Sequence, residues 1–325
     1  MHSSAKSPTT AQSRFEMPDF TQFHEVFRTE WGSPYSQEFV QETDINRKRL
    51  NGALFIDRVL KVLGITKSKS YPPKGDKGLY QLHQQICDSH SSVHQKLSVF
   101  YYLLLDFNEH LGTNTRTSFA DIFATRFAVP KKYETFMKGL WNMDRQQYNL
   151  ALEDLAHPSL SQEFSDDIII TLVQNAENDD YSLALAYYHT VKPILDDPSA
   201  LEHLFEAMAR TSLAEAFYFS RTHPEQTRRL LFEQLIASVL ESAGSADTAA
   251  RATELVSLPL DSAEEQWFQE YLTSGDGRKL RKAKDTVLMR RMVTGRHESI
   301  ADKDLGGQWG VVLGGFKSGM GGRVA

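Results

Sequence analysis

The sequence predicts an all-α fold, an irregular α-solenoid of stacked helix pairs, and three observations lead to it. Apolar residues over 131–241 recur every three or four residues, the period of a helix with one buried face. A Tyr-x-Leu-Ala-Leu core at 148–152 returns 33 residues later at 181–185, and a looser copy follows at 211–217. Repeats of this length are typical of stacked helix pairs. Nothing within 1–260 alternates convincingly at the period of a strand.

The helices of this block are separated by proline, which is tolerated at a first helical turn but not in a helix interior. Apolar stripes over 136–141 and 148–155 predict two helices. Three dipeptides mark breaks between further helices: His157-Pro158, Asp197-Pro198 and His223-Pro224. The small residue inside each repeat lets two helices approach closely.

Residues 1–14 predict a disordered tail. They are rich in Ser and Thr and lack acidic residues, an apolar run and an amphipathic arginine face, so they match neither a secretory signal nor a transit peptide. Four aromatic residues follow at helical spacing and are expected to pack in the core: Phe15, Phe20, Phe23 and Phe27. We expect one helical domain over 15–274.

The rest of the N-terminal half continues as helices. We expect Asp44 to cap a helix over 45–63 that Gly64 ends. Residues 66–77 hold two prolines and four lysines and predict an exposed loop. A helix resumes over 79–107, and its apolar second half is expected to be buried on several sides.

Composition limits the class of protein. With 41% apolar residues, a chain of 325 residues can bury a substantial core. A single cysteine, Cys87, excludes a disulfide framework and favours the cytosol or nucleus. The longest apolar runs fall far short of the ~20 residues that a membrane helix needs. We expect a soluble chain, peripheral to a membrane at most.

One pattern imitates a metal site. His83, Cys87, His90 and His94 would lie along one face of the predicted helix, and each is a zinc-ligand type. A straight helix spreads them over roughly 16 Å, so one ion could reach only an adjacent pair. We interpret them as a packed or solvated polar face and expect no metal site; a zinc enzyme using this face is the competing hypothesis.

Other candidates for chemistry are weaker. Gly310 and Gly315 have the spacing of a phosphate loop, but Phe316 stands where the motif needs lysine. Three charged pairs are interpreted as helix-start charges that favour the helix dipole: Asp144-Arg145, Asp166-Asp167 and Asp179-Asp180. We therefore expect no catalytic residues, no cofactor and no enzyme.

Charge is divided unevenly along the chain. Residues 276–325 carry 11 basic and 5 acidic residues, a net charge of +6, whereas the preceding 275 carry −12. The basic residues expected to contact a partner are Arg278, Lys279, Arg281, Lys282, Lys284, Arg290 and Arg291. Such a run serves nuclear import or partner recognition, contacts nucleic acid, or lies solvated against its own acidic body. These alternatives stay open.

The C-terminal segment combines glycine with large apolar residues. Gly306 to Gly322 holds 8 of the 19 glycines, too many for a stable helix. Aromatic residues would be unusual in a pure linker, so we expect an extended docking tail over 275–325 that places Trp309 and Phe316 in a partner's groove.

Several elements then match a known family in order. The motif is Trp141-x2-Asp144-x3-Tyr148-x2-Ala151-Leu152-x2-Leu155-x2-Pro158, followed by Ile168 to Leu172, Leu183-Ala184-Leu185 and Ser212-x2-Glu215-Ala216-x4-Arg221. It resembles the α-helical domain of the ELYS nuclear pore assembly proteins, over about 40–270 and best over 130–242. The resemblance implies a nucleoporin without known catalytic activity that is associated with the Y-shaped outer-ring scaffold.

Some family features are missing. Large animal members add a β-propeller and a long region with AT-hooks, and no Arg-Gly-Arg-Pro core occurs here, so chromatin binding does not carry over. The length is similar to the short fungal form. We expect a non-enzymatic nucleoporin at the nuclear envelope that docks on outer-ring scaffold nucleoporins and serves nucleocytoplasmic and mRNA transport, with an import receptor as a further partner. The alternative is a nucleic-acid- or chromatin-binding protein acting through the basic segment.

Overall fold

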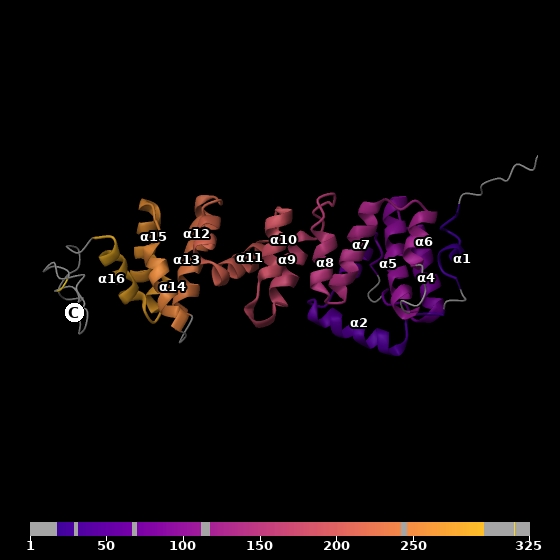
Figure 1. Ribbon diagram of the computed structural model, residues 1–325, viewed down its shortest axis with the longest axis horizontal. Helices are drawn as coiled ribbons and strands as arrows, with labels where there is room; N and C mark the ends of the chain where they lie inside the picture. The colour runs from indigo at the N-terminus through magenta and orange to yellow at the C-terminus, as the bar shows by residue number, and fades with distance from the viewer. Residues whose placement is uncertain are drawn as a thin grey trace, which may run out of the picture. The chain divides into compact units, whose positions relative to one another are not determined.

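The computed structural model describes residues 18–28, 32–66, 70–111, 118–241, 246–295 and Gly315. All regular structure in these ranges is helical, which confirms the all-α prediction (Figure 1). No helix in the described part is long and apolar enough to cross a bilayer. The expected N-terminal tail, Phe15 and most of the glycine-rich segment lie outside the described ranges.

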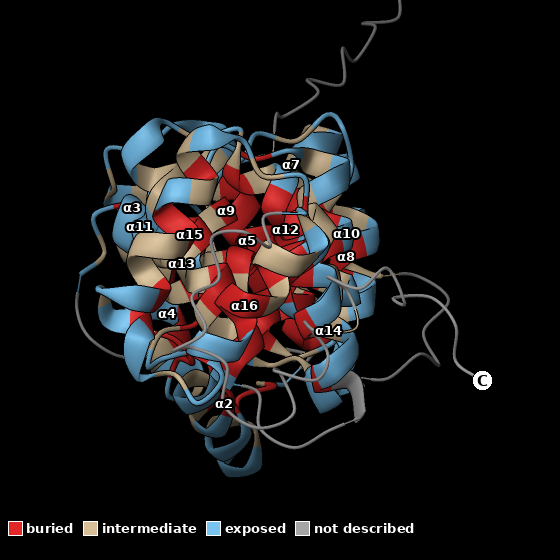
Figure 2. Cartoon of the chain, turned by 90° about the vertical axis from the view of Figure 1, so that its left-hand side faces the viewer, coloured by how far each residue is buried: buried red, intermediate tan, exposed pale blue. Residues whose placement is uncertain are grey.

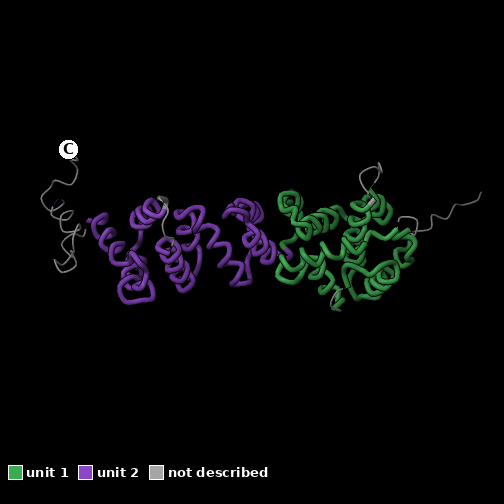
Figure 3. Tube along the Cα trace, turned by 90° about the horizontal axis from the view of Figure 1, so that it is seen from below, with its two compact units in different colours: residues 1–162 green, residues 163–325 purple. Residues whose placement is uncertain are grey.

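The chain folds into two compact units, residues 1–162 and 163–325 (Figure 3). Unit 1 contains α1 (Phe23–Val26), α2 (Gln37–Arg49), α3 (Phe55–Val62), α4 (Gly75–Asp88), α5 (Val93–Leu111), α6 (Phe119–Arg126), α7 (Lys131–Asp144) and α8 (Tyr148–Leu155). Unit 2 contains α9 (Ser165–Gln174), η2 (Glu177–Asp179), α10 (Ser182–Val191), α11 (Pro198–Thr211), α12 (Leu213–Ser220), α13 (Glu225–Glu241), α14 (Ala246–Ser257), α15 (Ser262–Thr273), η3 (Asp276–Lys279) and α16 (Ala283–Val293).

Successive helices pack as pairs, α7 with α8, α9 with α10 and α11 with α12. In the first two copies the alanine of the repeat lies in the second helix of its pair and is buried, at Ala151 and Ala184. In the looser third copy, Ala214, which follows Leu213, is half-buried, and Ala216 is the buried alanine of α12. Gly139 of α7 allows an even closer approach, because a Cβ there would stand 2.6 Å from Cγ of Leu155 in α8. Small residues therefore set the spacing of the pairs, as the repeat predicts.

Buried residues, red in Figure 2, lie toward the inside of the helix stack, and exposed residues lie toward the outside. Every residue of α5 from Val99 to Leu104 is at most 3% exposed, which confirms that this stretch is enclosed on several sides. Phe27 is buried and stacks on Phe107 of α5 with ring centroids 5.6 Å apart. The N-terminal aromatic residues that are described thus pack as core.

The helix expected over 45–63 is two helices, because α2 ends at Arg49 and α3 begins at Phe55. Asp44 does not cap a helix, because it lies inside α2, whose N-cap is Ser36. The Ser36 side chain accepts a hydrogen bond from the amide of Phe39, and Asp44 instead pairs with Arg47 at 2.7 Å. Gly64, with φ of 81°, follows the end of α3 as expected. A left-handed residue at this position suits glycine.

The predicted exposed loop over 66–77 is also wrong in part. Tyr71, Pro72 and Pro73 are buried, and α4 already begins at Gly75. The hydroxyl of Tyr71 donates to Asp106 of α5 at 2.9 Å. The lysines and prolines indicate a loop correctly, but the tyrosine anchors it in the core.

The helix expected over 79–107 is two helices, because α4 ends at Asp88 and α5 begins at Val93. His83 and Cys87 lie on α4 and His94 on α5, so the four potential ligands do not share one helix face. His83 is buried, with Nε2 3.0 Å from the carbonyl of Phe20. Burial lowers the pKa of His83, and His94 stacks on Tyr133.

Candidate interaction surface

The family motif lies around a buried carboxylate in unit 1. Asp106 of α5 has no exposed surface and accepts hydrogen bonds from the hydroxyls of Tyr35 and Tyr71, at 3.1 and 2.9 Å. The indole of Trp141 donates at 2.9 Å, and the guanidinium of Arg145 lies at 3.4 Å. Burial raises the pKa of Asp106 to about 6, although the charge of Arg145 opposes the shift. Trp141 is therefore a structural residue that ties α7 to α5.

Asp144 performs a second connecting role. It is the last residue of α7, so its interpretation as a charge at the start of its own helix is wrong. Its carboxylate instead accepts the amides of Phe55 and Ile56 at the start of α3, at 2.6 and 3.0 Å, and the hydroxyl of Tyr102 at 2.8 Å. Burial raises its pKa to about 7, against the effect of these hydrogen bonds. A helix start is thus capped from a distant part of the chain.

The other two charged pairs behave as expected except at Asp179. Asp166 and Asp167 lie in the first turn of α9. Asp180 precedes α10, and its carboxylate accepts the amide of Ser182 at 3.0 Å, which satisfies an amide that a helix start leaves free. Asp179 ends η2 and instead accepts from Tyr181 and Arg210, at 2.9 and 3.0 Å, so its interpretation as a helix-start charge is wrong.

The motif arginine of unit 2 belongs to a charged cluster. Arg221 donates two hydrogen bonds to Glu264 of α15, at 2.9 and 2.7 Å, and Arg228 of α13 donates to the same carboxylate at 3.1 Å. Asp261 and Glu264 also form the capping box of α15. Burial would raise the pKa of Glu264, but the hydrogen bonds from the two arginines outweigh it and lower the pKa. This cluster joins α12, α13 and α15.

The basic segment begins as a folded part of unit 2. η3 and α16 pack against α15, and α16 also packs against α14. Five of the expected partner-binding residues are exposed there: Arg278, Lys279, Arg281, Lys282 and Lys284. They stand on η3 and at the start of α16. Their side chains form a basic surface that a partner can reach.

Two arginines of the same segment are placed differently. Arg290 is 6% exposed, donates to the carbonyls of Val256 and Leu258 at 2.6 and 2.7 Å, and pairs with Glu265. It fastens α16 to unit 2 and is not available as a surface contact. Arg291 is half-buried. Trp309 and Phe316 lie outside the described residues, so their docking role stays a prediction.

Other features carry no chemistry that the geometry supports. Within the described ranges, no group of three or more histidine, cysteine, aspartate or glutamate side chains is arranged to hold a metal ion. Burial raises the pKa of the Cys87 thiol, which favours the unreactive protonated form. From the sequence, neither Asp106 nor Glu264 was identified as a buried carboxylate that connects helices. For Asp106 there was a signal, because it is the lone acid in the apolar stretch over 99–107.

Comparison with known proteins agrees with the motif. Residues 53–275 match a family described as "ELYS: Nuclear pore complex assembly". The uncharacterized protein ely5 of Schizosaccharomyces pombe is 26% identical over 234 residues, which cover 71% of this chain and 72% of ely5. Human Protein ELYS is 27% identical over 183 residues, which cover 55% of this chain but 8% of the human protein. Because the family match spans more than half of the sequence and includes both units, the chain belongs to the ELYS family of nuclear pore complex assembly proteins.

Proposed function

We propose that this chain is a non-catalytic nucleoporin that docks on the outer-ring, or Y-complex, scaffold and contributes to assembly of the nuclear pore complex. The observation that carries the proposal is the family match over 53–275. Its place of action is then the nuclear pore at the nuclear envelope. Stacked helix pairs suit this task, because they leave long surfaces for partners while each pair buries its apolar face against its neighbours.

The exposed basic surface supports docking through charge. Arg278, Lys279, Arg281, Lys282 and Lys284 stand on a folded support, which reduces the ordering cost of binding. An acidic patch on a scaffold nucleoporin would match it and would speed association at low salt. The same surface is accessible to an import receptor.

The test is size-exclusion chromatography of purified outer-ring scaffold nucleoporins with the full chain, at low and at physiological salt. One variant replaces the five exposed basic residues by serine, and another ends after Gly295. Ending after Ser274 is avoided, because it would remove Arg290 and its contacts with Glu265 and the end of α14. Both variants keep α16, so a loss of co-elution reports on the interface.

Each outcome has a distinct meaning. Loss of co-elution with the serine variant assigns docking to the basic surface, and loss only with the shortened chain assigns it to the segment of Trp309 and Phe316. Co-elution of every form moves the interface to the helical body. If the full chain does not co-elute at either salt concentration, docking on this scaffold is wrong.

A second candidate function is nucleic-acid binding by the same five side chains, which the exposed charge favours. Binding of a labelled DNA duplex would then weaken steeply with salt, with a slope of about −4 to −5 in log K against log salt if all five neutralise phosphates. The serine variant should lose both affinity and slope. Fluorescence anisotropy over a salt series measures this directly, and a flat response excludes it.

A further inference from the structure

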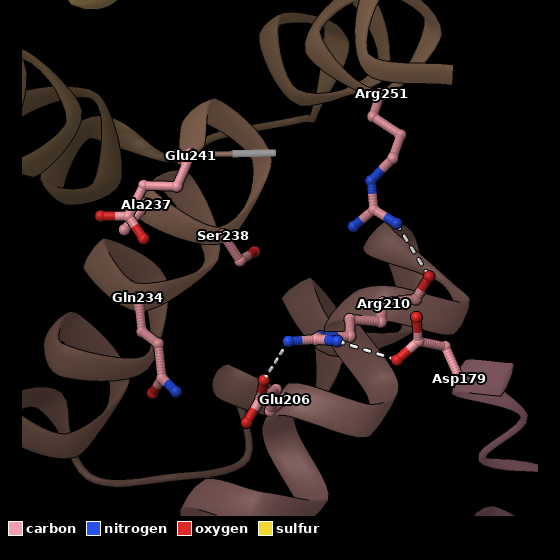
Figure 4. Close-up of a pocket in the computed structure, with 8 residues that line it drawn as sticks. All are labelled: Asp179, Glu206, Arg210, Gln234, Ala237, Ser238, Glu241 and Arg251. Carbon is pink, nitrogen blue, oxygen red and sulfur yellow. Dashed lines mark hydrogen bonds and ion pairs between the residues drawn. The ribbon is translucent and has the colours of Figure 1, made fainter. Parts of the chain in front are cut away.

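Unit 2 contains a cleft that the family match does not explain. It has a volume of about 650 Å³ and is lined by side chains from η2, α11, α13 and α14 (Figure 4). This size falls within the roughly 300–1,000 Å³ of typical ligand sites. Its polar lining residues are Asp179, Glu206, Arg210, Gln234, Ser238, Glu241 and Arg251. The cleft is therefore large enough for a few residues of a peptide.

The two arginines of the cleft already have partners in the protein. Arg210 lies between Asp179 and Glu206, with ion pairs of 3.0 and 2.6 Å, so two carboxylates face one guanidinium. Arg251 donates from its terminal nitrogens to the carbonyls of Ala209 and Arg210 near the end of α11, and Figure 4 shows the contact with Arg210. The terminal nitrogens of both guanidinium groups are thus already bonded within the protein.

Three groups remain for a ligand. Glu241 and Gln234, both on α13, have no side-chain hydrogen bond or ion pair to any described residue. The Nε of Arg251 also has no partner in the described structure, so one N–H donor stays unsatisfied. This atom is enclosed, so a ligand carbonyl reaches it only when the guanidinium turns toward the cleft, and the free-energy cost of an unsatisfied buried donor favours that turn.

The unbalanced charge of the cleft is negative. The three carboxylates of Asp179, Glu206 and Glu241 outnumber its two guanidinium groups, and α11 and α13 end close to the cleft, at Thr211 and Glu241. Helix C-termini carry a partial negative charge, so they also favour a cation. An anionic ligand would be repelled. A lysine or arginine side chain supplies the cation, and a peptide backbone supplies the carbonyl for Arg251.

One further residue extends the site along α13. Leu230, Gln234, Ala237 and Glu241 follow one another at steps of four, three and four, so they lie on one stripe of the helix. Leu230 is 67% exposed at the far end of this stripe. It lies roughly 16 Å from Glu241 along the helix axis. About five residues of extended chain cover that distance.

We propose that this cleft binds an extended basic peptide segment of a partner protein. A lysine or arginine pairs with Glu241, the backbone contacts Gln234 and Arg251, and an apolar side chain about five positions away covers Leu230. The inference is independent of docking on the outer-ring scaffold, because it concerns the chemistry of unit 2 alone. The chromatography above and the binding assay below can therefore fail separately.

The test uses fluorescence anisotropy with the full chain and a labelled peptide that has a central leucine and an arginine five positions on either side. With an arginine on each side of the leucine, the peptide can place one arginine at Glu241 whichever way its chain runs along α13. A second peptide carries glutamate in place of both arginines, and a third carries serine in place of leucine. We expect the first peptide to bind at least tenfold more tightly than the glutamate peptide and a few-fold more tightly than the serine peptide.

Substitutions on the protein locate the binding. Glu241→Lys should lower the affinity for the arginine peptide at least tenfold. Leu230→Ser should lower this affinity a few-fold and abolish the preference for leucine over serine in the peptide. Glu225→Lys is the matched control, because it makes the same charge change at an exposed position in the first turn of the same helix. Circular dichroism checks that each variant is folded. Equal binding by the wild type and Glu241→Lys, or no preference for arginine over glutamate, overturns the proposal.

Discussion

Unit 1 connects distant helices through enclosed carboxylates, whereas unit 2 does so through arginine–glutamate contacts that water partly reaches. Asp106 and Asp144 are 0% and 4% exposed, and most of their partners are neutral hydroxyl, indole and amide groups. Glu264 is equally buried, but the side chains of Arg221 and Arg228 are 28% and 21% exposed. The same chemical group, a carboxylate, therefore works in two electrostatic settings.

The difference teaches which partner sets the protonation state of a buried acid. Neutral donors, joined at Asp106 by the guanidinium of Arg145 at 3.4 Å, do not compensate for the loss of water around Asp106 and Asp144, so burial dominates and their pKa values rise to about 6 and 7. Two guanidinium groups do compensate at Glu264, and its pKa falls. The two units should thus respond differently to substitution, pH and salt.

The largest effect on stability should come from removing the Asp144 carboxylate of unit 1, which accepts three hydrogen bonds. Asp144→Ala leaves the amides of Phe55 and Ile56 and the hydroxyl of Tyr102 buried without their partner. We expect a loss of about 4 kcal/mol in the stability of unit 1. Hydrogen exchange read peptide by peptide should show amides of α3 and α7 exchanging about a thousandfold faster.

Glu153→Ala, at an exposed position of α8, is the control for this experiment and should change exchange little. Amides of unit 2 should also keep their rates if the effect is local. A change below about 1 kcal/mol for Asp144→Ala would mean that water replaces the lost acceptor, and the comparison between enclosed and accessible carboxylates would not hold.

A second test changes pH. The folded pKa values of Asp106 and Asp144, about 6 and 7, lie above the unfolded value of about 3.9, so the folded state binds protons more tightly. Lowering the pH from 7.5 to 5.5 should therefore stabilise unit 1, by about 3 kcal/mol. Hydrogen exchange, corrected for its intrinsic pH dependence, should slow in α5 and α7.

Unit 2 should respond in the opposite direction and at lower pH. The folded pKa values of Glu264 and Asp261 are lowered, so their contribution is present above the unfolded values and is lost as the pH falls through the folded ones. Exchange in α15 should stay constant from pH 7.5 to 5.5 and quicken only below about pH 4.5. Parallel behaviour of both units would contradict the assignment.

A third test removes only charge from unit 2. Glu264→Gln keeps the size of the side chain and an acceptor for the capping box but leaves Arg221 without its carboxylate and Arg228 with only that of Asp261. We expect a loss of about 1–2 kcal/mol, smaller than for Asp144→Ala because the arginines can be hydrated. Glu233→Gln, which affects the more exposed pair with Arg229, should cost less than about 0.5 kcal/mol. Thermal unfolding of the Asp144→Ala, Glu264→Gln and Glu233→Gln variants, compared with the wild type, ranks their losses of stability.

The parts of the fold that depend on neighbouring residues could be predicted from the sequence. Helical period, proline breaks and the repeat alanines act within one helix or between successive helices, so Ala151 and Ala184 are buried where the repeat indicates. Pro198 begins α11 with Asp197 as its cap for the same reason. These are local rules, and the folded chain obeys them.

Contacts between distant residues could not be predicted. Asp144 caps a helix that begins 89 residues earlier, and Tyr71 lies in a lysine-rich loop yet bonds to an acid 35 residues away. The cleft combines Glu206, Glu241 and Arg251 from three helices, and no spacing in the sequence relates them. Periodicity states which face of a helix is buried but not which side chain stands opposite.

The smallest effect on stability should come from salt, and we expect the two units to respond to it differently. Raising sodium chloride from about 0.05 to about 0.5 M should weaken exposed pairs such as Arg210 with Glu206, whose side chains are 47% and 44% exposed, by a few tenths of a kcal/mol. The contacts of Asp106 and Asp144 exclude ions and should not change. Glu206→Gln should remove part of the salt response of α11 and leave the exchange of the Phe55 and Ile56 amides, which donate to Asp144, unchanged. If exchange of these two amides quickens with salt as much as exchange in α11, ions reach the Asp144 carboxylate, and its raised pKa then needs a cause other than burial.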